Sequence, residues 1–166
     1  MRSPVAASGP VSGTVILDSH EILLVDAAAT EALGARLGAH LSVGDVVCLS
    51  GGLGAGKTTL ARGAISAWTG RDEEAPSPTY TLVQTYEGPR GELWHVDLYR
   101  LKTAEEAWEL GLEDAFAGAA CLIEWPERLD GYLPPSRLDI ALEPRDGGRV
   151  ARLAGHGLWR TKLDAI

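Results

Sequence analysis

The chain has 166 residues, a length typical of a single domain, and 45% of them are hydrophobic. Its formal net charge of −8 argues against a broad nucleic-acid-binding surface, because such a surface needs clustered Lys and Arg. No segment approaches the roughly 20 apolar residues of a membrane span, and residues 1–13 lack the continuous apolar core of a signal peptide. We therefore expect a cytoplasmic protein with a disordered tail over residues 1–13 and no membrane contact.

The two cysteines lie far apart in the sequence. Cys48 and Cys121 are each placed inside a separate apolar run. This placement predicts two small buried side chains in a reducing compartment rather than a disulfide or a metal-binding pair.

The first elements are a short strand and an amphipathic helix. Residues 21–25 form an apolar run that predicts the strand, and Asp26 can then cap the helix. Within this helix Leu33, Leu37 and Leu41 recur every four residues, which predicts one buried stripe.

A glycine-rich loop follows, between a predicted buried strand over residues 46–50 and a predicted helix over residues 57–68. Its sequence, GGLGAGKT, fits G-x-x-x-x-G-K-[ST] at every fixed position. Glycines let consecutive N–H groups converge on one anion, and the helix N-terminus adds partial positive charge. We expect Lys57 to bridge the β- and γ-phosphates of a nucleotide, Thr58 to bind Mg²⁺ and Thr59 to lie near the α-phosphate. The predicted nucleotide-binding residues of this motif are Gly52, Leu53, Gly54, Ala55, Gly56, Lys57, Thr58 and Thr59.

Residues 79–86 and 92–99 are rich in β-branched and aromatic residues, and Gly88-Pro89-Arg90-Gly91 joins them. Composition and spacing together predict a β-hairpin. The preceding loop contains Ser77-Pro78-Thr79. There a Thr79 hydroxyl can sense a γ-phosphate, as in switch loops, but the spacing alone does not exclude a turn that is merely stiffened by proline.

The second half of the chain continues with short elements. Thr103 and Glu106 have the spacing of a capping box that opens a helix, and Gly111 ends it. Residues 137–142 and 149–154 predict two further strands, which two intervening glycines join as another hairpin.

Two carboxylates are candidates for the metal. Glu124 ends an apolar strand predicted over residues 119–123. An acid at this position either binds the metal or simply faces solvent at the end of the strand. In the second hairpin strand, His95, Asp97 and Tyr99 alternate with apolar residues and so share one face. This alternation favours a functional role for Asp97. For His95 and Tyr99 it is equally consistent with structural hydrogen bonds.

These elements predict an α/β fold: a P-loop NTPase-like, three-layer domain with a mixed, largely parallel central sheet and antiparallel hairpin additions. We expect the domain to span residues 14–155, with a C-terminal tail over residues 156–166.

The motifs GGLGAGKTTLARG, SPTYTLVQTYEG, HVDLYRL and IEWPERL, in this order and spacing, resemble the TsaE (YjeE) family. The resemblance covers about residues 22–142. It implies a compact P-loop ATPase that binds ATP or ADP with Mg²⁺ and is weak alone. It also implies action with the TsaB–TsaD pair in threonylcarbamoyladenosine modification of tRNA, with tRNA contacted only through that pair.

The resemblance also implies roles for particular residues. The residue matching Trp125 adjoins the metal carboxylate, the segment containing Thr79 behaves as a switch loop, and residues 25–30, including Ala27 and Thr30, line the adenine. Residues implied to serve ATP and the metal are Lys57, Thr58, Asp97 and Glu124.

The chemistry expected is attack of water on the γ-phosphate, with charge neutralised by Lys57, Mg²⁺ and loop amides. Either Glu124 or Asp97 can orient the water. Two alternatives stay open: a small-molecule kinase of P-loop type, and a nucleotide-gated binding module with incidental hydrolysis. A GTPase is disfavoured because no N-K-x-D motif occurs.

Overall fold

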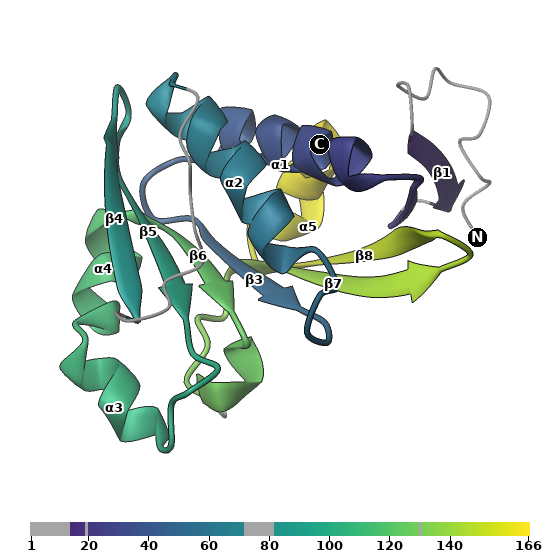
Figure 1. Cartoon of the computed structure of the whole chain (residues 1–166). Coiled ribbons are helices and arrows are strands. Elements are labelled where there is room, and N and C mark those ends of the chain that lie inside the picture. Colours follow the sequence, from purple (N-terminus) through teal and green to yellow (C-terminus); the bar gives the residue numbers. More distant parts are fainter. Residues whose placement is uncertain (1–13, 19, 72–81, 130) are drawn as a thin grey trace.

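The computed structural model describes residues 14–18, 20–71, 82–129 and 131–166. An eight-stranded sheet runs through it in the order β1-β2-β8-β7-β3-β6-β5-β4 (Figure 1). The strands are β1 (Thr14–Asp18), β2 (Glu21–Leu24), β3 (Val46–Ser50), β4 (Val83–Gly88), β5 (Gly91–Asp97), β6 (Ala120–Glu124), β7 (Arg137–Arg145) and β8 (Gly148–His156). The helices are α1 (Ala27–His40), α2 (Lys57–Thr69), α3 (Ala104–Glu109), α4 (Leu112–Gly118), η1 (Pro126–Leu129), α5 (Trp159–Lys162) and η2 (Leu163–Ala165).

The four central strands are parallel and the outer pairs are antiparallel. β3 is parallel to both β6 and β7, and β5 is parallel to β6. Antiparallel pairing adds β4 on one side and β8, β2 and β1 on the other. The predicted α/β class with a mixed central sheet and added hairpins is therefore confirmed.

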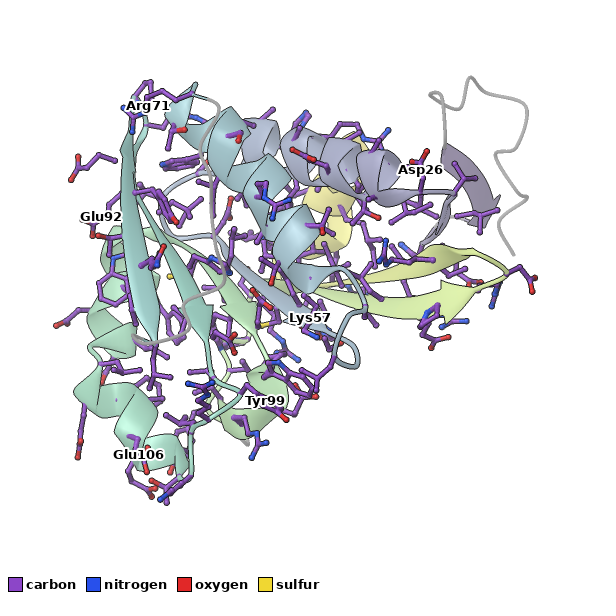
Figure 2. The ribbon with its side chains drawn as sticks, in the orientation of Figure 1. Asp26, Lys57, Arg71, Glu92, Tyr99 and Glu106 are labelled. Atoms are coloured by element: carbon purple, nitrogen blue, oxygen red, sulfur yellow. The ribbon has the colours of Figure 1, made fainter. Side chains whose placement is uncertain are left out.

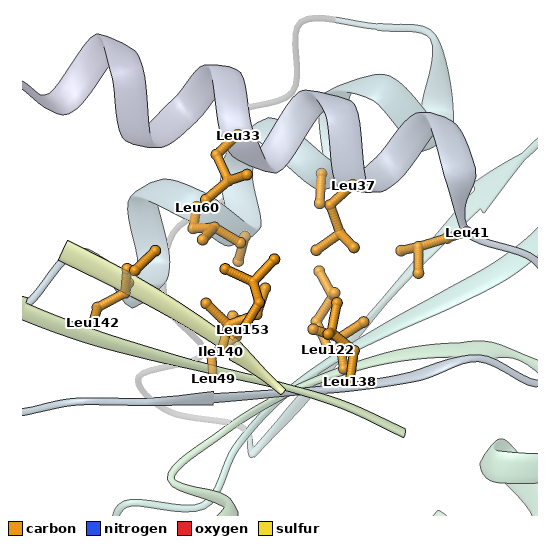
Figure 3. Packing of buried hydrophobic residues seen from close by; sticks show 14 of the residues in the cluster. Leu33, Leu37, Leu41, Leu49, Leu60, Leu122, Leu138, Ile140, Leu142 and Leu153 are labelled. Atoms are coloured by element: carbon orange, nitrogen blue, oxygen red, sulfur yellow. The ribbon is translucent and has the colours of Figure 1, made fainter. Parts of the chain in front are cut away.

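Helices cover both faces of the sheet and give three layers. α1, α2 and α5 lie on one face, and α3 and α4 lie on the other (Figure 1). In the larger core the predicted leucine stripe packs against the sheet: Figure 3 shows Leu33 and Leu37 of α1, and Leu41 directly after the helix. The smaller core, which includes Cys48 and Cys121, lies beneath α3 and α4. Both cysteines are buried and free, as their apolar surroundings in the sequence predict.

α1 and α2 begin and pack as local chemistry requires. The Asp26 side chain accepts a hydrogen bond from the Ala29 N–H at 2.8 Å, which confirms the predicted cap. The two helices approach so closely that a Cβ at Gly34 would lie 2.0 Å from the Leu60 carbonyl oxygen. The N-terminus of α2 is thereby fixed above the sheet.

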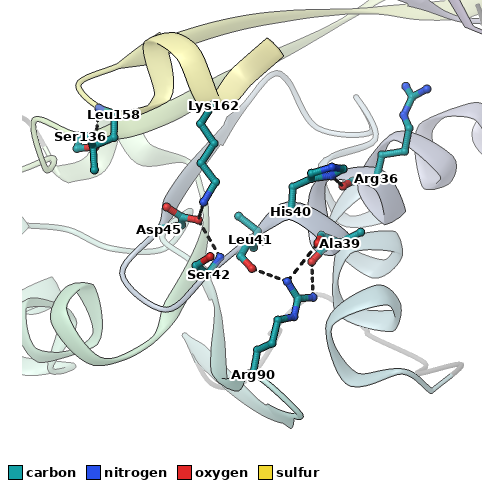
Figure 4. A network of polar contacts seen from close by, with 11 residues as sticks. Arg36, Ala39, His40, Leu41, Ser42, Asp45, Arg90, Ser136, Leu158 and Lys162 are labelled. Atoms are coloured by element: carbon teal, nitrogen blue, oxygen red, sulfur yellow. Dashed lines mark hydrogen bonds and ion pairs between the residues drawn. The ribbon is translucent and has the colours of Figure 1, made fainter. Parts of the chain in front are cut away.

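An arginine in the β4–β5 turn ties this hairpin to the end of α1. The Arg90 guanidinium donates to the carbonyl oxygens of Gly38, at 2.7 Å, and of Ala39 and Leu41 (Figure 4). The central carbon of the guanidinium group, Cζ, also lies 4.5 Å from the centroid of the Trp68 ring. A charged donor at the C-terminus of a helix satisfies carbonyls that have no partner within the helix.

The predicted capping box at Thr103 is wrong. Thr103 does precede α3, but its side chain makes no cap hydrogen bond, and the Glu106 N–H bonds instead to the Thr103 carbonyl oxygen at 3.2 Å. Backbone closure of this first turn leaves the hydroxyl unused. Gly111 ends the helix with a φ of 86°, and α4, which the sequence analysis did not anticipate, begins directly after it.

The chain beyond residue 155 packs onto the domain. β8 extends to His156, and the residues expected as a tail form α5 and η2, whose Trp159 and Leu163 are buried in the larger core. Lys162 on α5 pairs with Asp45 (Figure 4). Two apolar anchors and an ion pair therefore hold this segment. The expected tail over residues 1–13 lies outside the described residues. Among the described helices, none combines the length and hydropathy that a bilayer crossing would need.

Candidate functional site

The candidate site lies where the carboxyl ends of three parallel strands meet. In the sheet register Leu49 of β3 and Asp97 of β5 both pair with Glu124 at the end of β6. Because parallel strands end at the same edge, the loop after β3 faces the two predicted carboxylates. The topology therefore brings together three motifs that are distant in the sequence.

The loop between β3 and α2 has the backbone of an anion cradle. Gly51, Gly54 and Gly56 have φ angles of 140°, 75° and 104°, a region that side chains with a Cβ rarely adopt. Gly56 also occupies the N-cap position of α2, and no side-chain hydrogen bond caps this helix. The first N–H groups of α2 thus point toward the loop without a side-chain acceptor, which suits a phosphate.

Lys57 is buried at the floor of this loop, with 5% of its surface exposed. Its Nζ donates to the carbonyl oxygens of Gly51 at 2.7 Å and Gly52 at 2.8 Å. Burial lowers the pKa of the Lys57 ammonium, although the negative charges of Glu124, Asp97 and Glu127 act in the opposite direction. A cation taken out of water at this position is poised for an anionic ligand.

Glu124 lies across from the start of α2 and is buried, with 2% exposure. The Thr58 hydroxyl lies 3.4 Å from each of its carboxylate oxygens, Oε1 and Oε2. On the other side, His95 Nε2 lies 2.6 Å from Oε2. The solvent-facing alternative for Glu124 is therefore excluded.

Asp97 and Tyr99 lie nearer the solvent than His95. Asp97 is partly exposed, and its Oδ1 accepts a hydrogen bond from the Tyr99 N–H at 3.0 Å. Tyr99 is 41% exposed, and its ring lies 4.8 Å from the ring of Trp125, centroid to centroid. Lys57 Nζ in turn lies 4.4 Å from the Trp125 centroid, and Figure 2 shows Lys57 with Tyr99 close by. The two aromatic rings thus form one wall beside the lysine.

These groups line a cavity of about 250 Å³. Most of the residues that the sequence predicts to bind a nucleotide or metal are among its lining residues. The lining residues are Leu53, Gly54, Ala55, Gly56, Lys57, Thr58, Thr59, Asp97, Tyr99, Glu124, Trp125 and Arg149.

Some predicted residues are not in this lining. Gly52 contributes a carbonyl to Lys57 but does not line the cavity. Ala27 is exposed at the start of α1, and Thr30 is buried with its hydroxyl 3.3 Å from the Asp26 carbonyl oxygen. Neither of these α1 residues lines the cavity. Thr79 lies outside the described residues.

Sequence reasoning missed Arg149. Its guanidinium lies 3.5 Å from the Gly54 carbonyl oxygen, and a Cβ at Gly56 would lie 2.9 Å from its Nε. Among the described residues, no carboxylate lies within ion-pair distance of Arg149. Arg149 follows the glycine turn of the last hairpin, and only the pairing of β8 with β2 and β7 brings it beside the loop. No local pattern in the sequence signals this contact.

The donor set fits a nucleotide with Mg²⁺. The glycine loop and Lys57 offer N–H groups and one cation to phosphates, and Thr58, Glu124 and Asp97 offer oxygens to a hard metal ion. Within the described residues no three His, Cys, Asp or Glu side chains are grouped closely enough to hold a metal alone. That is compatible with Mg²⁺, since it usually takes one or two protein ligands and fills the rest with waters and phosphates.

Comparison with known proteins gives one consistent result. The family described as "Threonylcarbamoyl adenosine biosynthesis protein TsaE" matches residues 24–152. The tRNA threonylcarbamoyladenosine biosynthesis protein TsaE of Rickettsia conorii is 41% identical over 120 residues, covering 72% of this chain and 69% of that protein. The protein of the same name from Haemophilus influenzae is 40% identical over 69% of this chain and 72% of its own length. The crystal structure of YdiB from Bacillus subtilis is similar with a TM-score of 0.72 at 28% identity, covering 87% of this chain and 90% of that one.

Proposed function

The chain belongs to the TsaE family of tRNA threonylcarbamoyladenosine biosynthesis proteins, and on this premise we propose that it binds ATP with Mg²⁺ and hydrolyses it. We further propose that it is weakly active alone and acts in the cytoplasm with the TsaB–TsaD complex, through which it meets tRNA only indirectly. The family membership supports the pathway, and the cavity supports the nucleotide chemistry.

One observation carries the nucleotide proposal. The buried Lys57 begins α2 directly after the glycine-rich loop, no side chain caps this helix, and the buried Glu124 lies opposite Thr58 at the same cavity. A buried cation and a buried acid in one small cavity would cost stability without a ligand to use them. A triphosphate and its metal use both.

In this proposal each group has a definite role. Loop amides and Lys57 bind the β- and γ-phosphates and neutralise charge that develops during transfer to water. Thr58, Glu124 and Asp97 would hold Mg²⁺, which would add positive charge at the same phosphates. The two carboxylates share metal binding and the orientation of the attacking water. Thr79 is proposed as a sensor of the γ-phosphate.

The test is phosphate release from ATP by the full chain, measured alone, with TsaB, TsaD and tRNA, and with candidate small-molecule acceptors. We expect slow release alone, stimulation by the protein partners, and loss of release in Glu124→Ala. Phosphate transferred to an added metabolite would instead show a kinase. Support of tRNA modification by Glu124→Ala would show a nucleotide-gated binding module.

A Glu124→Ala variant also separates the metal step from nucleotide binding. We expect ADP affinity measured by calorimetry without metal to stay within about threefold of wild type, while Mg²⁺-dependent hydrolysis falls by about 100-fold or more. Equal losses in both measurements would show that Glu124 is structural.

A further inference from the structure

A buried histidine, His95, contacts the Glu124 carboxylate. His95 lies on β5, where the register pairs it with Leu122 of β6, two residues before Glu124. Because alternate residues of a strand share a face, the side chains of His95 and Glu124 project from the same face of the sheet. His95 Nε2 lies 2.6 Å from Glu124 Oε2, and the side chains are 0% and 3% exposed.

The hydrogen-bond pattern shows what this histidine contacts. With Glu124 ionised, its carboxylate only accepts hydrogen bonds, and His95 Nε2 is then the donor in this pair. The other ring nitrogen, Nδ1, is buried and has no hydrogen-bond partner among the described residues. Buried polar atoms that only support the core are usually paired. The bond to Glu124 is thus the polar contact that accounts for the orientation of His95.

The contacts of Glu124 are unequal. The Thr58 hydroxyl lies 3.4 Å from both carboxylate oxygens, but Oε2 has in addition the short bond to His95, which Oε1 lacks. Among the described residues, His95 is therefore the group that fixes the rotation of the carboxylate. Oε1 keeps lone pairs that no short hydrogen bond occupies, on the side of Thr58.

We propose that His95 is a positioning residue for Glu124: its bond fixes Oε2 and presents Oε1, beside Thr58, to the metal ion that accompanies the nucleotide. The inference rests on the proposed function. Groups that orient a metal ligand typically change metal affinity by about 10- to 100-fold when removed. A histidine that only fills the core would leave the balance between metal and nucleotide binding unchanged.

Two amide variants form a matched pair for the test. In His95→Gln the amide nitrogen lies near the place of Nε2 and can still donate to Glu124, whereas in His95→Asn it is one carbon too short. Both variants of the full chain are compared with wild type at one pH. The probes are ADP, titrated by calorimetry without metal, and Mn²⁺, titrated into the ADP complex by electron paramagnetic resonance.

We expect both variants to bind ADP without metal within about threefold of wild type. In His95→Asn, Mn²⁺ affinity falls by about tenfold or more, and in His95→Gln it stays within about threefold. Mn²⁺ affinity retained in His95→Asn, or lost equally in both variants, would overturn the inference. If His95→Asn does not fold, His95→Leu takes its place, because leucine fills the site without a donor: a tenfold loss of Mn²⁺ affinity in His95→Leu beside retained affinity in His95→Gln supports the role, and equal affinity in both variants refutes it.

The same titrations separate the two proposals. A wild-type chain that binds no ADP would overturn the proposed function together with this inference. A wild-type chain that binds ADP and Mn²⁺, with His95→Asn binding Mn²⁺ equally well, would overturn the role of His95 alone.

Discussion

Replacing Lys57 by methionine should remove most of the affinity for ADP. Methionine keeps the length of the side chain and removes its charge. At about 4 Å and an effective dielectric constant of about 20, one pair of unit charges is worth about 4 kcal/mol. Binding must first release Lys57 from the carbonyls of Gly51 and Gly52, at 2.7 and 2.8 Å, so part of this gain is offset.

A net loss of about 2–3 kcal/mol remains, which corresponds to a rise in the dissociation constant of about 30- to 150-fold. The assay is calorimetric titration with ADP in the presence of EDTA, so that metal ligands do not contribute. The fold should survive, because burial already lowers the pKa of Lys57 and its removal relieves a desolvated charge. A thermal melt of the variant checks this point.

Lys162→Met is the matched control. Lys162 also lies over a tryptophan ring, 5.0 Å from the Trp159 centroid, but it pairs with Asp45 and does not line the cavity. The Lys162→Met substitution removes the same charge as Lys57→Met and should leave ADP affinity unchanged. A loss of ADP affinity of less than about fivefold in Lys57→Met would refute the reasoning. Equal losses of affinity in both variants would also refute it, because the net charge of the protein, and not the position of Lys57 in the loop, would then govern binding.

Three further predictions concern the neighbourhood of the site and the fold. Arg149→Ala should weaken ADP binding by about fivefold with little change in Tm, because the guanidinium that packs on the loop is lost; unchanged affinity in calorimetry would contradict this. Arg90→Ala should lower the free energy of unfolding in urea by about 2 kcal/mol, with ADP affinity kept, since three helix-end carbonyls lose a charged donor; an unchanged urea midpoint would count against that role. Burial raises the pKa of the Cys121 thiol to about 12 and raises that of Cys48 as well, so neither should react with Ellman's reagent at pH 8 until the chain is unfolded. Fast reaction of the native protein would show that a thiol is accessible.

Local patterns predicted the parts of the site that depend on local structure. The glycine loop is such a part, because its conformation and the following helix are encoded within one stretch of sequence. The alternation in β5 likewise placed His95 and Asp97 on one face. The bond from His95 to Glu124 depends on the register between β5 and β6, and a register shift of one residue would place the two side chains on opposite faces of the sheet. Two helices separate these strands in the sequence, and the sequence of neither strand alone specifies their register.

The contacts that sequence reasoning missed are all long-range. Arg149 reaches the loop across a gap of 95 residues, and Lys162 reaches Asp45 across 117. Trp159 joins the core because α5 folds back on the sheet, although its own segment shows no amphipathic repeat long enough to predict a helix. In each case tertiary packing selects a partner that the local sequence does not specify.

The buried acid explains why the end of β6 is built as it is. Every residue of β6 is buried, and an apolar side chain at its last position would pack without cost. Glu124 instead requires a buried donor, and His95 supplies it while leaving its own Nδ1 without a partner among the described residues. Such a pair is a weak source of stability, because desolvation offsets much of the attraction. A ligand that engages the Oε1 oxygen of Glu124 together with Lys57 offsets that cost only when it is bound, so the arrangement favours binding over stability of the empty protein.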